Sequence, residues 1–236
     1  MRYIFNQFQG LGDILFCEPI AKYYHNNGEN EIIWPIAGDF LWLREYFPYI
    51  NFVNWQEFNF PYESTYHGQV TENEIHVPLR FANPIVRNLH PHDYSDQFHT
   101  MVDKYRMVNL PLDMWKTMTW IRNNQREDEL YNMLVQDTNY ILVNNMWSDG
   151  VLNIQINNPD NHQIVYMNRV PGYTMLDWAK VIENANQIYT VSTSNLFLIE
   201  TLSIKATDVY IYPRLPRENN FDGILEFVNK NFKLII

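Results

Sequence analysis

Short apolar runs alternate with longer amphipathic segments along most of the chain. The apolar runs lie between polar or glycine-containing turns, which is typical of strands, and the amphipathic segments are typical of helices. We expect strands at residues 2–5, 31–36, 51–55, 74–79, 115–120, 139–145, 163–167, 188–191 and 207–212. We expect helices at residues 14–24, 39–47, 99–108 and 196–202, a helix or linker at 123–134, and a helix that starts at a capping box of Thr174 and Asp177. This alternation predicts an α/β fold whose parallel sheets are covered on both faces.

The pattern restarts near the middle of the chain. Residues 139–145 repeat the arrangement of the opening, in which an apolar strand runs into a polar turn. The 236 residues are enough for two small domains. We therefore expect an N-terminal domain of residues 1–120 and a C-terminal domain of residues 121–236.

The turn after the first strand carries candidate chemistry. Gly10 and Gly12 allow a tight turn, and Asp13 stands where the next helix begins. Because a helix N-terminus has unpaired N–H groups and a partial positive charge, it can hold an anion or favour an ionised acid. Two interpretations of Asp13 stay open, a catalytic carboxylate and a helix cap.

A second informative turn, Ser192-Thr193-Ser194-Asn195, lies between a buried strand and a helix. Small hydroxyls and free N–H groups at such a turn can hold a pyrophosphate without many cations. The same residue types also favour helix caps, so a well-capped helix without a ligand is the other open interpretation.

The first turn resembles a known family. Gly10-Leu11-Gly12-Asp13-Ile14-Leu15, followed by Pro19 and Ala21, is similar to the opening of the bacterial lipopolysaccharide heptosyltransferases. The resemblance implies a glycosyltransferase of the GT-B type, in which two Rossmann-like domains with parallel sheets face each other across a cleft. It also implies that Asp13 is the catalytic base.

The second turn resembles the second domain of the same family, which has a strand, an Asp-Ser/Thr-Gly turn and a helix. Three positions depart from that pattern, because Ser192 stands for the family aspartate, Ser194 for the glycine and Phe197 for the histidine. The resemblance therefore implies the fold more firmly than it implies the nucleotide or the sugar.

Further candidate residues surround the two turns. For the donor and its phosphates, the candidates are Gly12, Ser192, Thr193, Ser194, Asn195, Glu200, Arg169 and Arg214. For the acceptor, we expect a polar loop over residues 80–93 that supplies Arg80, Arg87, His90 and His92. Glu200 has the alternative of an exposed helix residue, and the histidines have that of simple surface exposure.

Charge and cysteine content narrow the classes of partner. Lys and Arg total 17 against 27 Asp and Glu, a formal charge of −10, and no basic stripe occurs, so we expect no nucleic-acid partner. The single cysteine, Cys17, excludes an internal disulfide and a cysteine-built zinc site. His90, His92 and His99 lack the spacing that defines a metal site, so we expect no metal and no other cofactor.

Hydropathy bears on the location of the protein. No apolar stretch reaches the length of a membrane span, and the start of the chain turns polar too soon for a secretory signal. We expect a soluble, cytoplasmic protein with no transmembrane segment.

Together these observations favour a metal-independent glycosyltransferase that moves a sugar from a nucleotide-sugar donor to a hydroxyl of a glycan or glycolipid acceptor. Inversion at the anomeric carbon is implied by the family resemblance. Two alternatives stay open: a sugar-nucleotide epimerase or hydrolase of the same shape, and a non-catalytic protein that binds a nucleotide or a glycan.

Overall fold

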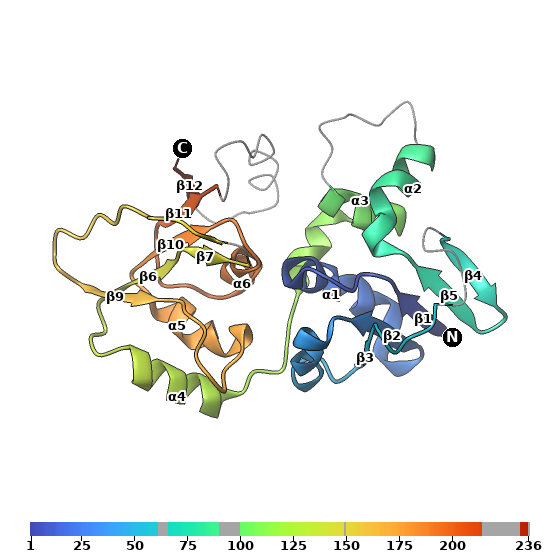
Figure 1. The fold of residues 1–236 in the computed structure, drawn as a ribbon, viewed down its shortest axis with the longest axis horizontal. Helices are drawn as coiled ribbons and strands as arrows, with labels where there is room; N and C mark the ends of the chain where they lie inside the picture. Colours follow the sequence, from blue (N-terminus) through green and yellow to red (C-terminus); the bar gives the residue numbers. More distant parts are fainter. Residues whose placement is uncertain (61–65, 90–99, 149, 214–231, 236) are drawn as a thin grey trace. The chain divides into compact units, whose positions relative to one another are not determined.

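The chain divides into two compact units, Met1–Ile121 and Arg122–Ile236 (Figure 1). The computed structural model describes residues 1–60, 66–89, 100–148, 150–213 and 232–235. Each unit has its own five-stranded sheet and its own buried hydrophobic residues.

The first unit is built on a five-stranded sheet in the order β3-β2-β1-β5-β4. Its strands are β1 (Arg2–Phe5), β2 (Glu31–Ile36), β3 (Ile50–Asn54), β4 (Gly68–Thr71) and β5 (Glu74–Val77). The first three strands and β5 are parallel, and β4 is an antiparallel edge strand. Because β2 and β3 lie on one side of β1 and β5 lies on the other, the strand order reverses between β1 and β5. In open α/β sheets, ligands bind beyond the carboxyl ends of the strands at this point.

Helices cover one face of this sheet. They are α1 (Leu11–His25), α2 (Ala82–Leu89) and α3 (Thr100–Met107), with shorter 3-10 turns η1 (Asn26–Gly28), η2 (Gly38–Glu45), η3 (Leu79–Phe81) and η4 (Leu112–Thr117). Phe16 of α1 meets the ring of Tyr105 edge-on and stacks on Trp115, and the Tyr105 hydroxyl donates a 2.7 Å hydrogen bond to the Phe16 carbonyl. These contacts fix α3 beside α1.

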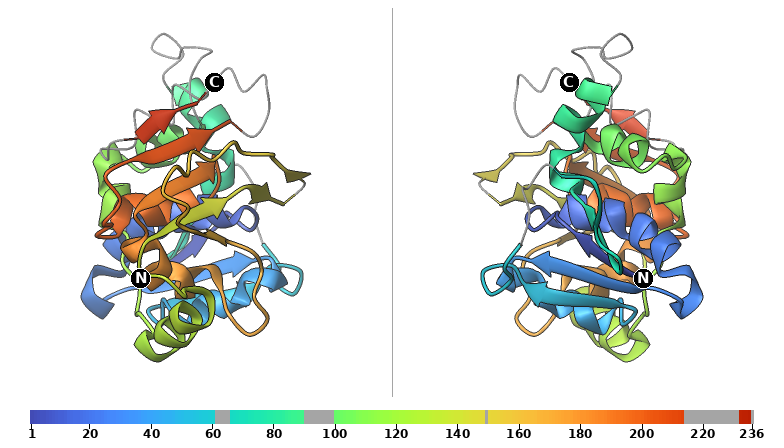
Figure 2. Two further views of the ribbon diagram at one scale, coloured as in Figure 1. Left: turned by 90° about the vertical axis from the view of Figure 1, so that its left-hand side faces the viewer. Right: turned by 90° about the vertical axis from the view of Figure 1, so that its right-hand side faces the viewer.

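The second unit has a sheet of five parallel strands in the order β12-β11-β10-β6-β9. The strands are β6 (Tyr140–Asn144), β9 (Gln163–Tyr166), β10 (Gln187–Val191), β11 (Val209–Tyr212) and β12 (Phe232–Leu234), and β7 (Met146–Trp147) pairs with β8 (Gly150–Val151) outside the sheet. From the centre to one edge, β10, β11 and β12 follow one another, orange to red in Figure 2. The strand order reverses between β6 and β10, which is the second switch point.

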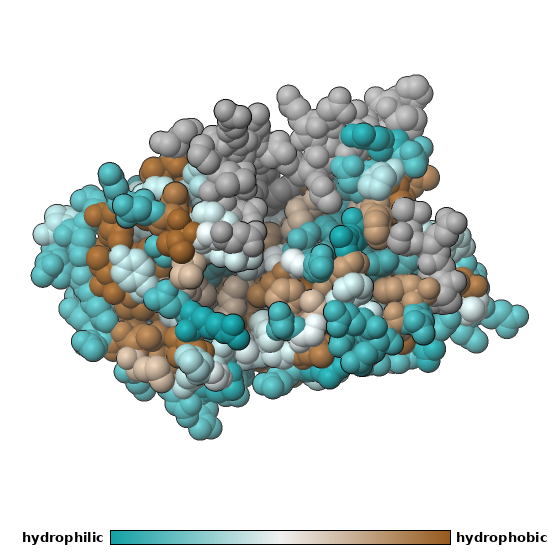
Figure 3. All heavy atoms as spheres, viewed as in Figure 1, coloured by the Kyte–Doolittle hydropathy of each residue, from teal (hydrophilic) through white to brown (hydrophobic). Residues whose placement is uncertain are grey.

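The two faces of the second sheet have different covers. Helices α4 (Asn124–Leu134), α5 (Ala179–Asn184) and α6 (Asn195–Thr201), with the turn η5 (Met175–Trp178), belong to one side, where the Tyr140 hydroxyl donates to the Val181 carbonyl over 2.6 Å. On the other face Ile141 and Tyr189 pack against Ile154, which belongs to the non-helical segment between β8 and β9. Figure 3 shows hydrophobic residues at the surface of this unit, where Met146 of β7 and Val151 of β8 are exposed.

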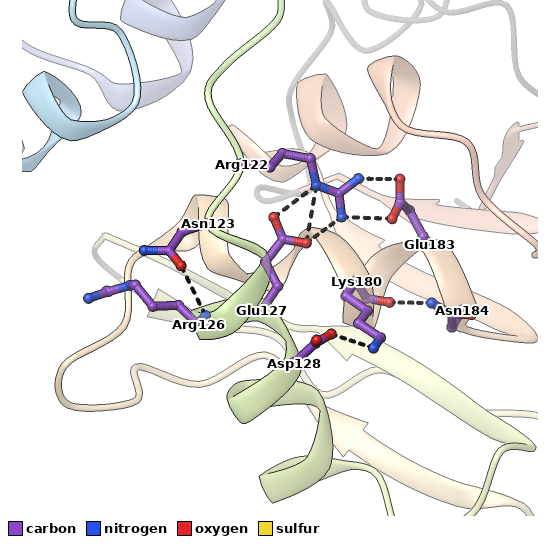
Figure 4. Close-up of polar contacts among 8 residues, drawn as sticks. All are labelled: Arg122, Asn123, Arg126, Glu127, Asp128, Lys180, Glu183 and Asn184. Carbon is purple, nitrogen blue, oxygen red and sulfur yellow. Dashed lines mark hydrogen bonds and ion pairs between the residues drawn. The ribbon is translucent and has the colours of Figure 1, made fainter.

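Ion pairs join α4 to α5. Arg122, directly before α4, bonds the carboxylates of Glu127 on α4 and Glu183 on α5, with an Nη1 to Oε1 distance of 2.7 Å for Glu183 (Figure 4). The expected capping box is confirmed, because Thr174 and Asp177 exchange both of its hydrogen bonds at the start of η5. Arg126 of α4 bonds the same Asp177 carboxylate over 2.8 Å.

Several local expectations were wrong. Residues 82–89 form α2 rather than a loop, because Ala82, Ile85, Val86 and Leu89 have the i, i+3, i+4, i+7 spacing of a helical face. Residues 112–117 form η4 rather than part of a strand at 115–120. The first helix begins at Leu11, three residues before its expected start at Ile14, so Asp13 lies inside its first turn. The strands β4 and β12 were not expected at all.

Candidate functional site

In the first unit, the loop that joins β1 to α1 carries Asp13. Gly10 precedes the helix with φ of 80°, a left-handed conformation that favours glycine. A Cβ atom at Gly10 would lie 2.5 Å from Asp13 Oδ2, so only glycine leaves room for the carboxylate to fold back over the turn. The Asp13 side chain is 37% exposed, which keeps it accessible beside the first switch point.

A buried lysine contacts this carboxylate. Lys104 of α3 is 1% exposed, and its Nζ lies 3.1 Å from Asp13 Oδ1. The same ammonium donates to Gln7 Oε1 over 2.5 Å and to the Leu79 carbonyl over 3.2 Å. Gln7 in turn donates to the Gln9 carbonyl over 2.6 Å, which orders the loop before α1.

Sequence reasoning missed Lys104 because a single lysine in a short helix usually faces solvent. The positions of its apolar neighbours could have indicated that Lys104 is buried. Lys104 follows Met101 by three residues and adjoins Tyr105, which places it on the inward-facing side of the helix. A charge at such a position needs a buried partner.

Aromatic side chains flank the expected acceptor arginine in the first unit. The ring of Phe8, just after β1, stacks on Trp55, just after β3, with centroids 4.6 Å apart. The Arg80 guanidinium lies over the same Phe8 ring at 4.1 Å from its centroid, and the residue is exposed. Arg87 is exposed near the end of α2. His90 and His92 lie outside the described residues.

In the second unit, the turn Ser192–Ser194 joins β10 to α6 at the switch point. Asn144, the last residue of β6, donates from Nδ2 to Thr193 Oγ1 over 3.0 Å and to Thr190 Oγ1 over 3.1 Å. Sequence reasoning missed Asn144 because nothing in its own segment points to a threonine far along the chain. The Ser192 N–H donates to the Tyr212 carbonyl, which extends the β10–β11 ladder into the turn.

Only some of the polar residues of this turn are accessible to solvent. Ser192 and Asn195 are buried, whereas Thr193 and Ser194 are half-buried. Within the described part of the chain, the N–H groups of Thr193 and Ser194 have no acceptor, and the side-chain oxygen and nitrogen of Asn195 have no partner. The Ser194 hydroxyl donates to Met175 Sδ over 3.3 Å. Among the described residues, the turn therefore combines two N–H donors that have no acceptor with the hydroxyl of the half-buried Thr193, whereas the Ser194 hydroxyl is engaged by Met175.

The remaining donor candidates lie at varied distances along the chain from this turn. Glu200 is half-buried near the C-terminal end of α6. Arg169 is exposed in the loop after β9 and forms no ion pair with the residues that the structure describes. Gly12 is the second residue of α1 and has no positive φ. Arg214 falls outside the described residues.

The described parts of the chain contain neither a metal-binding cluster nor a membrane-spanning helix. Among the described residues, no group of three or more His, Cys, Asp and Glu side chains gathers as a metal site would require. No helix in the described ranges is long and apolar enough to cross a membrane.

Comparisons with known proteins show a shared fold. No protein-family profile and no curated protein sequence matches the chain. Among solved structures, the chain is similar to the bacterial iron-containing dodecameric glycosyltransferase TibC from enterotoxigenic E. coli H10407, with 11% identity and a TM-score of 0.52 over 90% of this chain. The aligned part spans 57% of the TibC chain.

Two further structures match at lower TM-scores. They are a family 9 glycosyl transferase from Veillonella parvula DSM 2008, at 11% identity and TM-score 0.49, and the E. coli heptosyltransferase WaaC, at 10% identity and TM-score 0.49. The former covers 99% of this chain and 86% of its own, and the latter covers 100% and 93%. The strand orders of the two sheets and the similarity to TibC confirm the expected fold class, two α/β units with Rossmann-like parallel sheets.

Proposed function

We propose that the protein is a glycosyltransferase that moves a sugar from a nucleotide-sugar donor to a hydroxyl of a glycan or glycolipid acceptor. The observation that carries the proposal is the partly exposed Asp13 carboxylate, held at the switch point of the first sheet. Ligands of open α/β sheets bind at such points, and a carboxylate there can act on a bound hydroxyl.

In the proposed reaction, Asp13 takes the proton of the acceptor hydroxyl as that oxygen attacks the anomeric carbon of the donor. The bond from the anomeric carbon to the nucleoside diphosphate breaks, and the diphosphate leaves as an anion. Direct attack of this kind inverts the anomeric centre. Asp13 Oδ2 is the oxygen assigned to this role, because Oδ1 bonds Lys104.

The turn after β10 is the proposed site for the leaving diphosphate. The N–H groups of Thr193 and Ser194, which have no acceptor among the described residues, and the Thr193 hydroxyl supply hydrogen-bond donors, which stabilise the developing negative charge without a metal ion. The other proposed donor contacts are Gly12, Ser192, Asn195, Glu200, Arg169 and Arg214, and the proposed acceptor contacts are Arg80, Arg87, His90 and His92. The buried position of Ser192 favours support of the turn over direct contact.

Donor binding can be tested by thermal unfolding in the presence of ADP, GDP, UDP and their sugar conjugates, each with magnesium or with EDTA. A ligand at 100 times its dissociation constant adds about 2.7 kcal/mol of stability. We expect one nucleotide class to raise Tm equally with and without the metal. No shift with any nucleotide would refute the proposed phosphate turn.

Transfer itself is tested with the Asp13→Asn variant. We expect the variant to bind the donor but to lose transfer, because the amide cannot accept the proton. The variant's stability must be measured too, because Lys104 loses its counter-charge. Turnover of the donor without any acceptor would favour the epimerase or hydrolase, and no turnover at all would favour a binding protein.

A further inference from the structure

Lys104 is a charged group that the protein buries almost completely. An ammonium has three N–H donors, and Lys104 directs its donors to three acceptors, namely Asp13, Gln7 and the Leu79 carbonyl. These acceptors belong to the first turn of α1, the loop after β1 and the segment after β5. The ammonium therefore joins the three segments that surround the first switch point.

We propose that Lys104 is a positioning residue for the transfer reaction, which orients the Asp13 carboxylate so that Oδ2 faces the acceptor hydroxyl. This inference rests on the proposed function. Lys104 bonds Asp13 Oδ1, and Oδ2 lies in the space that a side chain at position 10 would fill, which Gly10 leaves open. The ion pair with Lys104 thus sets the direction of Oδ2, the proposed functional oxygen.

The burial of Lys104 excludes a direct role at the substrate. Its side chain is 1% exposed and its three donors are occupied, so it has neither a surface nor a hydrogen to offer a ligand. Lys104→Met removes the cost of burying an ammonium, but it also leaves Gln7 Oε1 and the Leu79 carbonyl without this donor. Because the Asp13 side chain is 37% exposed, water can solvate its carboxylate in the variant, so we expect a folded protein. Its free energy of unfolding is measured together with its kinetics.

Kinetics of the full chain can separate positioning from a purely structural role. We expect Lys104→Met to lower kcat at least tenfold while the KM values for donor and acceptor stay within twofold. The matched control is Lys116→Met, which removes an ammonium whose partner is the exposed Asp113 and should leave kcat unchanged. If Lys104 acts through Asp13, adding Lys104→Met to Asp13→Asn will lower kcat no further. Unchanged kcat in Lys104→Met, or fully multiplicative losses in the double variant, would overturn the proposal.

A spectroscopic readout makes the test independent of turnover. With aspartate labelled by ¹³C at the side-chain carboxyl carbon, the Asp13 resonance is the one that disappears in Asp13→Asn. We expect this resonance to shift in Lys104→Met and to stay in place in Lys116→Met. A shift in a protein that transfers no sugar would support the hold of Lys104 on Asp13 while refuting the proposed function. An unmoved resonance would refute the hold itself.

Discussion

Asn144 Nδ2 lies 3.0 Å from Thr193 Oγ1 and donates a hydrogen bond to it. The bond joins the carboxyl end of β6 to the turn after β10, on the two sides of the second switch point. Because the threonine hydroxyl accepts from the amide, its own proton is left to donate to an anion. This hydrogen bond thus fixes the position of the turn and leaves the Thr193 hydroxyl as a hydrogen-bond donor at the proposed phosphate site.

Replacing Thr193 by valine tests this donor. The substitution keeps the shape of the side chain but removes the donor for a phosphate and the acceptor for two groups, the Asn144 amide and the Asn195 backbone N–H. We expect the affinity for a nucleoside diphosphate to fall about tenfold, which corresponds to the net value of about one hydrogen bond, roughly 1 kcal/mol or somewhat more. Isothermal titration calorimetry measures the change.

The matched control is Thr201→Val at the end of the helix that follows the turn, where the hydroxyl donates only to backbone carbonyls within α6. The affinity of Thr201→Val for the nucleoside diphosphate should equal that of the wild type. Equal losses in the two variants would show that the effect comes from the stability of α6 and would contradict a phosphate contact at Thr193.

Gly10→Ala tests the place of the Asp13 carboxylate. The new Cβ would lie 2.5 Å from Asp13 Oδ2, so the carboxylate must move away. We expect kcat for transfer to fall at least tenfold and the free energy of unfolding to fall by about 1 kcal/mol, because alanine is strained at positive φ.

Gly28→Ala separates these two effects. Gly28 also has a positive φ, 98°, but nothing lies within 4 Å of the position that an alanine methyl group would take there. It should show the same loss of stability and full activity. If Gly28→Ala lowers kcat as much as Gly10→Ala, displacement of Asp13 does not explain the loss.

The sequence predicted best the elements whose residues agree with one another locally. Arg2–Phe5 and Glu31–Ile36 form strands with the expected bounds, since each is a short apolar run that ends at a polar turn. The sequence-based prediction failed where a segment combines polar residues with a helical apolar face, as in Ala82–Leu89. In that segment the Asn and Arg residues concealed the helical spacing of the apolar residues, which pack against α3.

The candidate site could also be predicted only in part, because the sequence shows which residues are close along the chain but not which distant residues meet. Gly10 and Asp13 stand together in the sequence, so the turn could be located from the residues alone. The partner of Asp13 could not, because Lys104 comes from a distant helix and reaches the turn only through tertiary packing. Asn144 and Thr193 are likewise separated by 49 positions, and only the parallel pairing of β6 with β10 brings them together.

Arg122→Met tests the ion-pair cluster at the start of the second unit. Glu127 is 2% exposed, and removing Arg122 leaves its carboxylate buried without its charge partner (Figure 4). We expect the free energy of unfolding to fall by roughly 3 kcal/mol, the range found when one member of a buried pair is removed. Urea denaturation followed by far-UV circular dichroism measures the loss.

Lys180→Met is the control for this cluster, because it breaks the neighbouring but more exposed pair with Asp128. Exposed pairs contribute about 1 kcal/mol or less, so this variant should unfold close to the wild type. If Lys180→Met lowers the free energy of unfolding as much as Arg122→Met does, the burial of Glu127 does not explain the large loss expected for Arg122→Met.

Glu18 makes stability depend on pH. Burial in α1 raises the pKa of its carboxyl group from 4.5 to about 7, although a hydrogen bond from the Tyr49 hydroxyl acts in the opposite direction. Between these two pH values the folded state keeps a proton that the unfolded state has released, so the free energy of unfolding falls as pH rises. Glu18→Gln cannot ionise. Relative to this variant, the wild type should lose about 3 kcal/mol between pH 4 and pH 8, from 1.36 kcal/mol per pKa unit.

The measurement is urea denaturation of both proteins at one-unit pH intervals, with Glu72→Gln as the exposed control. The difference in the free energy of unfolding between wild type and Glu18→Gln should be constant above pH 8, because Glu18 is then ionised in the folded and the unfolded state alike. The free energy of unfolding of Glu72→Gln should change with pH as that of the wild type does. A difference that does not change with pH, or one that favours the wild type at high pH, would show that the folded protein accommodates the Glu18 carboxylate as readily as water does.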